Sequence, residues 1–512
     1  MSETPKGTKK MSLVTDSPVN SSSSDDFASF LDATLDSDFA ESSPEGEAEN
    51  EDDDKDDDNF ENKRIKRCKV ENLVTAEESS GSTLRASGKE KKRGNLVRAR
   101  ASWVRRWKYC PVYRGCVFCE ELLDRWEWTL GLFSFCEEES TKKDACTHPG
   151  SFGDMCILCG QRLEEETGVT FGYIHKGLRL NNDEIVRLRS TDMKNLIRHK
   201  KLCLVLDLDH TLLNSTRLVD LSSEEQYLKS QAFSPQDASE GSLFVLEAMH
   251  MMTKLRPFVR NFLKEVYNLF ELYVYTMGDR PYALAMAKLL DPRREYFGDR
   301  IISRDDGTLK HQKGLDVVLG QESAVLILDD TENAWIKHHK ENLILMERYH
   351  FFRSSTHQFG YNCKSLSELK SDESETEGAL VTVLNVLKQV HSMFFDERGI
   401  DHIIRDVRQV LKTLRKEVLK GCKIVFSRVF PTEFQAENHQ LWKMAEQLGA
   451  TCGIELDPSV THVVSLDVGT EKSRWAVKEN KFLVHPRWIE AANYMWKRQP
   501  EDNFSVNQVK NQ

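Results

Sequence analysis

The sequence predicts an α/β protein in which a parallel sheet, covered by helices, is followed by a second and smaller α/β unit. The first observation is that apolar, strand-like runs alternate with helix-like runs between residues 202 and 359, which is typical of a parallel sheet buried on both faces. The second is that this alternation resumes on a smaller scale after residue 418. The third is length, because 512 residues are enough for two or three domains.

Residues 1–100 are predicted to be a disordered tail, because they contain polar runs such as SSSSDD and EDDDKDDD and few aromatic residues. Such a segment cannot bury enough apolar surface to offset the entropy of the chain. The tail is acidic first, with 18 Asp and Glu against 4 Lys and Arg in residues 1–60. It is then basic, with 15 Lys and Arg against 4 Asp and Glu in residues 63–108.

Two basic clusters lie in that second part, KRIKRCK at 63–69 and KEKKRG at 89–94. They suit nuclear import or binding to a polyanion, and a charge-balanced linker is the alternative.

No apolar run has the length of a bilayer span, and the N-terminus lacks the apolar core of a signal peptide. We therefore expect a soluble protein of the nucleus, with no membrane partner and no need for direct nucleic-acid binding. Residues 101–145 are rich in tryptophan and fit neither the periodicity of a helix nor the alternation of a strand, so they stay unassigned.

The segment CTHPGSFGDMCILCG brings four soft or borderline metal ligands into one short loop. These are Cys146, His148, Cys156 and Cys159, which together are enough for tetrahedral Zn²⁺. Unpaired surface thiols are the alternative, and a second pair, Cys116 and Cys119, could compete for the metal. In an intracellular protein the twelve cysteines are expected to be thiols or metal ligands rather than disulfides. Residues 146–200 are therefore a candidate structural zinc region that leads into the sheet.

Three of the predicted strands end directly before polar residues. In a parallel α/β sheet, ligands bind beyond the carboxyl ends of the strands, so these polar side chains are expected to converge. They are Asp207 and Asp209 after LCLVL, Thr276 after LFELYVY, and Asp329 and Asp330 after AVLIL, with Lys313 in the connection between the last two strands. A cluster of carboxylates is costly without a cation, and oxygen ligands around a small pocket favour Mg²⁺.

These residues lie in motifs that resemble a known superfamily. DLDHT at 207–211 is similar to the Asp-x-Asp-x-Thr motif of haloacid dehalogenase-like phosphatases. Four further motifs, at 254–263, 273–283, 303–307 and 327–335, resemble the TFIIF-associated branch that dephosphorylates the C-terminal domain of RNA polymerase II. With the C-terminal unit included, the chain is most similar to the plant C-terminal-domain phosphatase-like proteins. The resemblance implies a Rossmann-type parallel sheet over 201–365, and residues 168–180 resemble the short strand pair that precedes it.

The residue types suit hydrolysis of a phosphoserine ester. Asp207 would attack phosphorus and form an aspartyl phosphate, and Asp209 would protonate the serine oxygen and then take a proton from water. Thr276 and Lys313 would hold the phosphoryl oxygens. By analogy with the family, Thr211 supports the motif loop.

The metal would be held by Asp207, the Asp209 carbonyl and Asp330. Asp329 would either orient a metal-bound water or bind directly, and Mn or Co could substitute for Mg²⁺. The family resemblance also implies that Arg304 contacts the substrate. Arg256, in the sequence KLRP, is assigned a structural role, with a place in the groove as the alternative.

Two further segments have open assignments. The polar, turn-rich insertion at 216–252 could shape a groove for an extended peptide, or be a surface loop without consequence. Residues 366–417 show helical periodicity and are assigned as a helical connector, with a partner helix as the alternative.

The smaller unit, at 418–508, resembles a BRCT domain in the order of its strands and helices and in Trp488 of its last helix. Ser427 and Lys472 lie where some BRCT domains bind phosphate, but Arg428 replaces the glycine usual in those members. Phosphopeptide capture and a phosphate-independent protein surface therefore both stay open. TFIIF or other transcription proteins are the expected partners of this unit.

The leading functional hypothesis is a nuclear, Mg²⁺-dependent protein-serine/threonine phosphatase that acts on the phosphorylated heptad-repeat C-terminal domain of RNA polymerase II and so regulates transcription. One alternative is a catalytically weak scaffold that acts through its BRCT unit. Another is a small-molecule phosphohydrolase on the same fold. The complete set of carboxylates counts against the first alternative, and the BRCT unit and basic clusters count against the second.

Overall fold

The computed structural model describes residues 146–506, apart from 164–167, 238, 240, 362, 397–404 and 432–434. The predicted disordered tail at 1–100, the unassigned region at 101–145 and the cysteine pair of that region lie outside the described residues. Within the part of the chain that the structure describes, no helix combines the length and the apolar character needed to cross a membrane.

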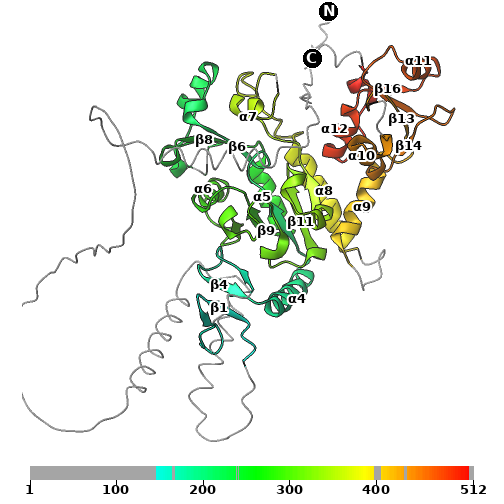
Figure 1. Cartoon of the computed structure of the whole chain (residues 1–512). Coiled ribbons are helices and arrows are strands. Elements are labelled where there is room, and N and C mark those ends of the chain that lie inside the picture. The colour runs from blue at the N-terminus through cyan, green and yellow to red at the C-terminus, as the bar shows by residue number, and fades with distance from the viewer. Residues whose placement is uncertain are drawn as a thin grey trace, which may run out of the picture. The chain divides into compact units, whose positions relative to one another are not determined.

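The central unit is built on a five-stranded parallel sheet with strand order β10-β9-β5-β11-β12 (Figure 1). The strands are β5 (Leu202–Leu206), β9 (Phe270–Tyr275), β10 (Ile301–Ile302), β11 (Val325–Asp329) and β12 (Leu343–Leu345). Every side chain of β5 and β11 is buried, as expected of inner strands covered on both faces. The predicted parallel α/β sheet is confirmed, and its three inner strands end at one edge.

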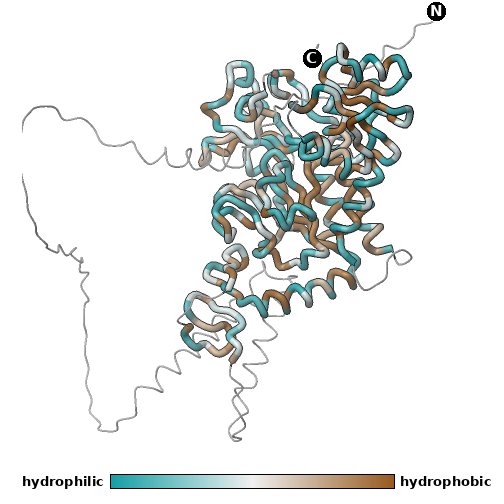
Figure 2. The backbone as a smooth tube through the Cα atoms, turned by 45° about the vertical axis from the view of Figure 1, so that its right-hand side comes forward, coloured by the Kyte–Doolittle hydropathy of each residue, from teal (hydrophilic) through white to brown (hydrophobic). Residues whose placement is uncertain are grey.

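Helices complete the core of this sheet. They are α4 (Asn182–Arg198), α5 (Val259–Tyr267), α6 (Arg280–Leu290), α8 (Ala379–Phe394) and α9 (Val407–Val418). Apolar residues of α5, α6, α8 and α9 share one buried cluster with the strands. Figure 2 shows hydrophobic segments concentrated in the interior of the described chain and hydrophilic segments on its outer turns. Within the region assigned as a connector, α8 and the start of α9 are therefore part of the core.

The predicted insertion at 216–252 is folded. Strands β6 (Leu213–Arg217), β7 (Leu243–Leu246) and β8 (Met251–Leu255) form an antiparallel sheet with the order β6-β8-β7. A separate apolar cluster joins this sheet to Tyr349, Phe351 and Phe352, which come just before the short helix α7 (Arg353–Gln358).

A small antiparallel sheet precedes the central unit, with the order β2-β1-β4-β3. Its strands are β1 (Gly150–Phe152), β2 (Met155–Cys156), β3 (Val169–Thr170) and β4 (Leu178–Leu180). The last two match the strand pair that the sequence predicted at 168–180. Strands β1 and β2 have only two or three residues each, too short for periodicity to detect.

The C-terminal unit has a four-stranded parallel sheet with the order β14-β13-β15-β16. Its elements are β13 (Lys423–Ser427), α10 (Gln440–Gln447), β14 (Thr451–Gly453), β15 (His462–Ser465), α11 (Glu471–Lys478), β16 (Phe482–Val484) and α12 (Arg487–Met495). Trp488 is fully buried, and the His462 ring stacks on it with 4.6 Å between centroids. The three strands expected from the sequence are present, and β14 adds a short fourth.

Candidate active site

The carboxyl end of β5 places two aspartates at the edge of the central sheet. The backbone N–H of Asp207 still donates to the carbonyl of Leu328 in β11, at 3.0 Å. The chain then turns at His210, whose φ of 61° lies in the left-handed region, and returns as β6. Asp207 and Asp209 are only 6% and 8% exposed. Both carboxylates are thus buried where ligands of a parallel α/β sheet bind.

Lys313 connects the ends of two neighbouring strands. Its Nζ donates to Asp207 Oδ1 at 2.6 Å and to Asp329 Oδ2 at 2.7 Å, and its side chain is buried. Burial alone would lower the pKa of Lys313, but the charges of the two aspartates raise it well above its ordinary value. The residue therefore supplies a fixed positive charge in contact with Asp207.

Asp329 and Asp330 have different partners. Asp329 accepts a second hydrogen bond from Trp335 Nε1 at 2.9 Å, while Asp330 accepts one from Arg348 Nε at 2.7 Å. Burial raises the pKa of Asp329, although Lys313 opposes this effect. Burial acts in the same direction on Asp330, but the Arg348 guanidinium holds the pKa of that carboxyl below its ordinary value.

Three of these carboxylates form a candidate metal site. Oxygens of Asp207, Asp329 and Asp330 all lie within 4.8 Å of one another, and all three residues are buried. Burial raises the pKa of Asp207 well above its ordinary value, and the charge of Asp329 raises it further. The cluster is therefore short of positive charge, and its donors are all oxygen. A small, hard cation fits both properties.

Asp209 has a partner that the sequence did not predict. The Tyr282 hydroxyl, from the first turn of α6, donates to Asp209 Oδ1 at 2.5 Å. Burial raises the pKa of Asp209 to about 6, although the hydrogen bond from Tyr282 lowers it. The Thr276 hydroxyl also lowers this pKa, but the buried Oδ2 atom has no hydrogen-bond partner of normal geometry among the described residues. Asp209 thus has one oxygen held by the protein and one left for a reacting group.

Thr276 follows β9 at the same edge of the sheet. It is buried, its N–H donates to the Ile302 carbonyl at 3.0 Å, and its Oγ1 accepts from Gly278 N–H at 3.0 Å. A Cβ at Gly278 would lie 2.5 Å from the Tyr282 ring, so only glycine fits this turn. Arg304 is half-buried at the start of a short 3-10 helix (Arg304–Asp306), and its backbone N–H donates to the Gly278 carbonyl at 3.0 Å.

Thr211 and Arg256 support the loop after β5. Thr211 Oγ1 accepts the Asp330 backbone N–H at 3.1 Å, which joins the loop to the end of β11. Arg256 is 1% exposed and donates to the Thr211 carbonyl at 3.0 Å, while its other nitrogens hold Glu373 at 2.7 and 2.9 Å. Arg256 therefore lies in the interior rather than in a groove.

Sequence reasoning thus missed three functional partners, Tyr282, Trp335 and Arg348. Tyr282 and Trp335 lie inside motifs that the sequence analysis singled out, and a buried tyrosine or tryptophan needs a partner for its polar atom, so a signal was present. Arg348 follows β12, outside every motif, and no pattern in the sequence links it to Asp330.

A cavity of about 450 Å³ opens beside Asp209. Its lining includes Asp209 and Tyr282, then Arg217, Asp220 and Met251 from the predicted insertion, and Arg353 and His357 from α7. The insertion at 216–252 therefore forms one wall of a cavity that reaches the candidate acid.

The structure also brings the four predicted zinc ligands together. They belong to the small antiparallel sheet and its turns and not to the central sheet. Side-chain donor atoms of Cys146, His148, Cys156 and Cys159 all lie within 4.8 Å of one another. The cysteines are free thiols.

In the C-terminal unit, Ser427 and Lys472 are engaged within the protein. The Ser427 hydroxyl is buried and donates to Thr470 Oγ1 at 2.8 Å. Lys472 Nζ donates to the carbonyls of Ile454 at 2.6 Å and Phe426 at 3.3 Å. Arg428, with a φ of 54°, forms an ion pair with Asp467 at 2.8 Å. A phosphate bound here would have to replace internal hydrogen bonds.

Two families match the chain. The NLI interacting factor-like phosphatase family matches residues 202–377, and the BRCA1 C Terminus (BRCT) domain family matches residues 415–492. The first match spans all four aspartates of the candidate active site.

Curated relatives extend the similarity beyond these segments. The chain is 67% identical over 381 residues to RNA polymerase II C-terminal domain phosphatase-like 4 of Arabidopsis thaliana, covering 73% of this chain and 86% of that protein. It is 41% identical over 332 residues to the phosphatase-like 3 protein of the same plant, covering 63% of this chain but 26% of that longer protein. Among solved structures, Fcp1, an essential RNA polymerase II CTD phosphatase, matches with 25% identity and a TM-score of 0.50, covering 62% of this chain and 100% of that one.

Proposed function

The chain belongs to the family of RNA polymerase II C-terminal-domain phosphatases, and we propose that it hydrolyses phosphoserine in the heptad-repeat tail of that polymerase with Mg²⁺ as cofactor. One observation carries the proposal for the site. Lys313 bonds to Asp207 and Asp329 together, while Asp330 lies within 4.8 Å of both carboxylates. This arrangement joins a nucleophile, a phosphate-binding cation and a set of metal ligands in one buried cluster.

The first chemical step is attack by a carboxylate oxygen of Asp207 on phosphorus, which breaks the bond to the serine oxygen and leaves an aspartyl phosphate. Asp207 must be ionised to attack, and burial works against this. The positive charge of Lys313, in contact with Oδ1, favours the ionised form. A bound Mg²⁺, held by Asp207, the Asp209 carbonyl and Asp330, with Asp329 beside it, would offset the charge of the phosphoryl oxygens.

Asp209 supplies and removes the proton. The leaving serine oxygen needs a proton, and a carboxyl group with a pKa of about 6 can hold one near neutral pH. After the serine departs, the ionised Asp209 takes a proton from the water that attacks the aspartyl phosphate. Release of inorganic phosphate then restores Asp207. The Tyr282 hydroxyl holds one oxygen of Asp209 throughout, which leaves the other to face the substrate.

Thr276 and Lys313 are proposed to hold the phosphoryl oxygens, and Arg304 to contact the peptide. The cavity beside Asp209 supports a peptide substrate, because Arg217, Arg353 and His357 line it and suit a phosphorylated chain, while the Asp220 carboxylate there is paired with Arg217 at 2.7 Å. The insertion adds a wall to this cavity, and we expect the residues that flank the phosphoserine to lie along it.

The C-terminal unit is proposed to recruit protein partners in the nucleus, TFIIF or other transcription proteins among them. The internal bonds of Ser427 and Lys472 favour a phosphate-independent surface over phosphopeptide capture. Recruitment raises the local concentration of substrate around the catalytic site without changing the chemistry.

The test compares three substrates on the full chain, namely phosphorylated heptad-repeat peptides, an unrelated phosphoserine peptide and sugar phosphates. Activity on the heptad peptides is expected with Mg²⁺, lost with EDTA and recovered on adding Mg²⁺. Ca²⁺ should restore little, because its larger and looser coordination shell disturbs in-line attack. Preference for sugar phosphates would contradict the substrate assignment, and full activity in Ca²⁺ or EDTA would contradict the metal assignment.

A further inference from the structure

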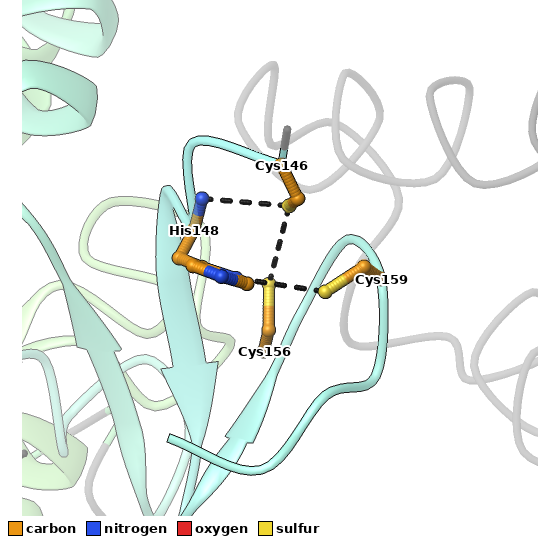
Figure 3. A group of neighbouring side chains, drawn as sticks. All are labelled: Cys146, His148, Cys156 and Cys159. Atoms are coloured by element: carbon orange, nitrogen blue, oxygen red, sulfur yellow. Dashed lines mark hydrogen bonds between the residues drawn. The ribbon is translucent and has the colours of Figure 1, made fainter. Parts of the chain in front are cut away.

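The small sheet before the central unit carries a cluster of side chains that the phosphatase chemistry does not use. Cys146 and His148 come just before β1, Cys156 ends β2, and Cys159 lies in the turn that follows. Figure 3 shows the four side chains converging from the two sides of the hairpin. Cys146 Sγ lies 3.9 Å from Cys156 Sγ, and Cys159 Sγ lies 3.5 Å from His148 Nδ1.

These separations match the edges of a tetrahedron around zinc. Zinc binds sulfur at about 2.3 Å and imidazole nitrogen at about 2.0–2.1 Å. With tetrahedral angles, two sulfur ligands then lie about 3.8 Å apart, and a sulfur and a nitrogen about 3.6 Å apart. A disulfide would instead place two sulfurs about 2.0 Å apart. Two of the donor pairs therefore already have the spacing that a tetrahedral metal requires, and the donor atoms all lie within 4.8 Å of one another.

The backbone around the cysteines is arranged to receive thiolates. N–H groups of His148, Leu158 and Gln161 point to Cys146, Cys156 and Cys159 at N···S distances of 3.4, 3.3 and 3.5 Å. Each donor lies two residues beyond its cysteine. Gly160 closes the second turn with a φ of 70°, and its N–H donates to the Cys156 carbonyl at 3.0 Å. Hydrogen bonds to sulfur favour the ionised thiolate, which is the form that binds metal.

The small sheet has few buried apolar side chains of its own, although the Tyr173 hydroxyl also donates to the Val317 carbonyl of the central unit at 2.9 Å. Its strands have two or three residues each, and its buried side chains are few, chiefly Phe171, Leu178 and Leu180. Units with so small a core commonly depend on a metal or disulfides for stability. Here the hairpin also holds the start of α4, because Asn181 caps that helix and donates through Nδ2 to the His148 carbonyl at 3.0 Å.

We propose that Cys146, His148, Cys156 and Cys159 bind one Zn²⁺ in a closed, structural site that holds the β1–β2 hairpin and the N-terminal cap of α4. All four positions are filled by protein ligands, so the site has no open position for water or substrate. Three sulfurs and one nitrogen select zinc, whereas the carboxylates of the central unit select Mg²⁺. The two metals therefore do not compete, and the zinc site stands whether or not the proposed phosphatase mechanism is right.

The experiment measures zinc in the full chain, purified without chelators, by atomic spectroscopy, with Co²⁺ exchanged for zinc in a parallel sample. One zinc per chain is expected, and Co²⁺ should show the visible bands of a tetrahedral site with thiolate charge transfer. Cys156→Ser and Cys159→Ser should each lower zinc affinity by at least about tenfold. The exposed free thiol Cys363 gives the matched control, since Cys363→Ser should keep the full zinc content.

The competing cysteine pair is tested in the same way. Cys116→Ser with Cys119→Ser should leave the zinc in place, and loss of zinc in this double variant instead would overturn the assignment. Zinc below about one-fifth of a mole per mole of wild-type chain, or an octahedral Co²⁺ spectrum, would also overturn it. Should the serine variants fail to fold, His148→Cys keeps four ligands. It should retain zinc and strengthen the thiolate charge-transfer band of Co²⁺, and an unchanged spectrum would exclude His148 as a ligand.

Discussion

The central unit and the C-terminal unit are both parallel sheets with polar residues at the carboxyl ends of inner strands, but these residues differ in what they have left to bind. In the central unit, Asp209 Oδ2 is buried without a hydrogen-bond partner among the described residues. In the C-terminal unit, Ser427 donates to Thr470, Thr470 donates to Ser473, and Ser473 donates to the Asp467 carbonyl. The central sheet thus leaves a carboxylate oxygen free at the ends of its strands, whereas in the C-terminal sheet the hydroxyl groups at that position bond to one another.

The difference shows that the same position in a fold can serve chemistry or stability. Buried carboxylates keep their charge only if a cation compensates it, so a lysine, an arginine or a metal ion must lie close to them. Hydroxyl groups are neutral and satisfy one another at little cost. The chemistry of each unit therefore follows from the charge at its strand ends and not from the sheet.

The largest effect is expected at the nucleophile. Asp207→Asn is nearly isosteric but removes the charge that attacks phosphorus, so kcat on a phosphorylated heptad peptide should fall by at least about four orders of magnitude. Stopped assays with inorganic phosphate detection measure this loss. The far-ultraviolet circular dichroism of the variant should match that of wild type, which shows that the central unit is folded and that the loss is chemical. Appreciable turnover by the variant would rule out the covalent mechanism.

The second comparison separates catalysis from recruitment. Truncation before Gly421 removes the C-terminal sheet and keeps α9 and the four aspartates of the candidate active site. Turnover of a short phosphopeptide should stay within about threefold of wild type, because the transition-state contacts remain. Activity on intact polymerase should fall by roughly ten- to a hundredfold, because the effective concentration is lost. Equal losses on both substrates would mean that the C-terminal unit helps to form the catalytic groove.

A smaller effect is expected at the tyrosine that holds the acid. Tyr282→Phe removes the hydrogen bond to Asp209 Oδ1 but leaves the ring in place, so kcat should fall by about tenfold with KM nearly unchanged. Steady-state kinetics on a heptad peptide measure both constants. Tyr267→Phe, on the half-buried face of α5, is the matched control and should change neither constant. A rise in KM alone would assign Tyr282 to substrate binding instead.

The last prediction concerns stability rather than activity, through the pH dependence of the C-terminal unit. Burial lowers the pKa of His462 to about 4, although its hydrogen bond to Glu501 opposes this. Because the folded pKa lies below the unfolded value, the free energy of unfolding is complete above about pH 6.5 and falls as the pH drops towards 4. The loss should not exceed about 3 kcal/mol.

Urea unfolding at pH 7 and pH 4.5, followed by near-ultraviolet circular dichroism, to which the buried Trp488 contributes, measures this loss. His462→Gln cannot titrate in this range and should reduce the dependence on pH. The same pH slope in both proteins would show that other groups, such as carboxylates, account for it.

Periodicity along the chain was enough to predict the parallel sheet, because every side chain of β5 and β11 is buried and both strands are therefore continuous apolar runs. It was also enough to predict where the carboxylates lie, because the residue after a buried parallel strand must lie at the carboxyl edge of the sheet. Strands β1 and β2 escaped prediction because two or three residues give no measurable period.

The sequence by itself determined the fold class, the strand ends and the residue types that gather there. Only the tertiary structure decided which groups pair, since Tyr282 is 73 residues from Asp209 and Lys313 is 106 residues from Asp207. It also decided that α8 and the start of α9 join the core and that the Ser427 hydroxyl is satisfied internally. The physical reason is that burial leaves a local pattern in the sequence, whereas hydrogen bonds and ion pairs depend on how distant strands are ordered in the sheet.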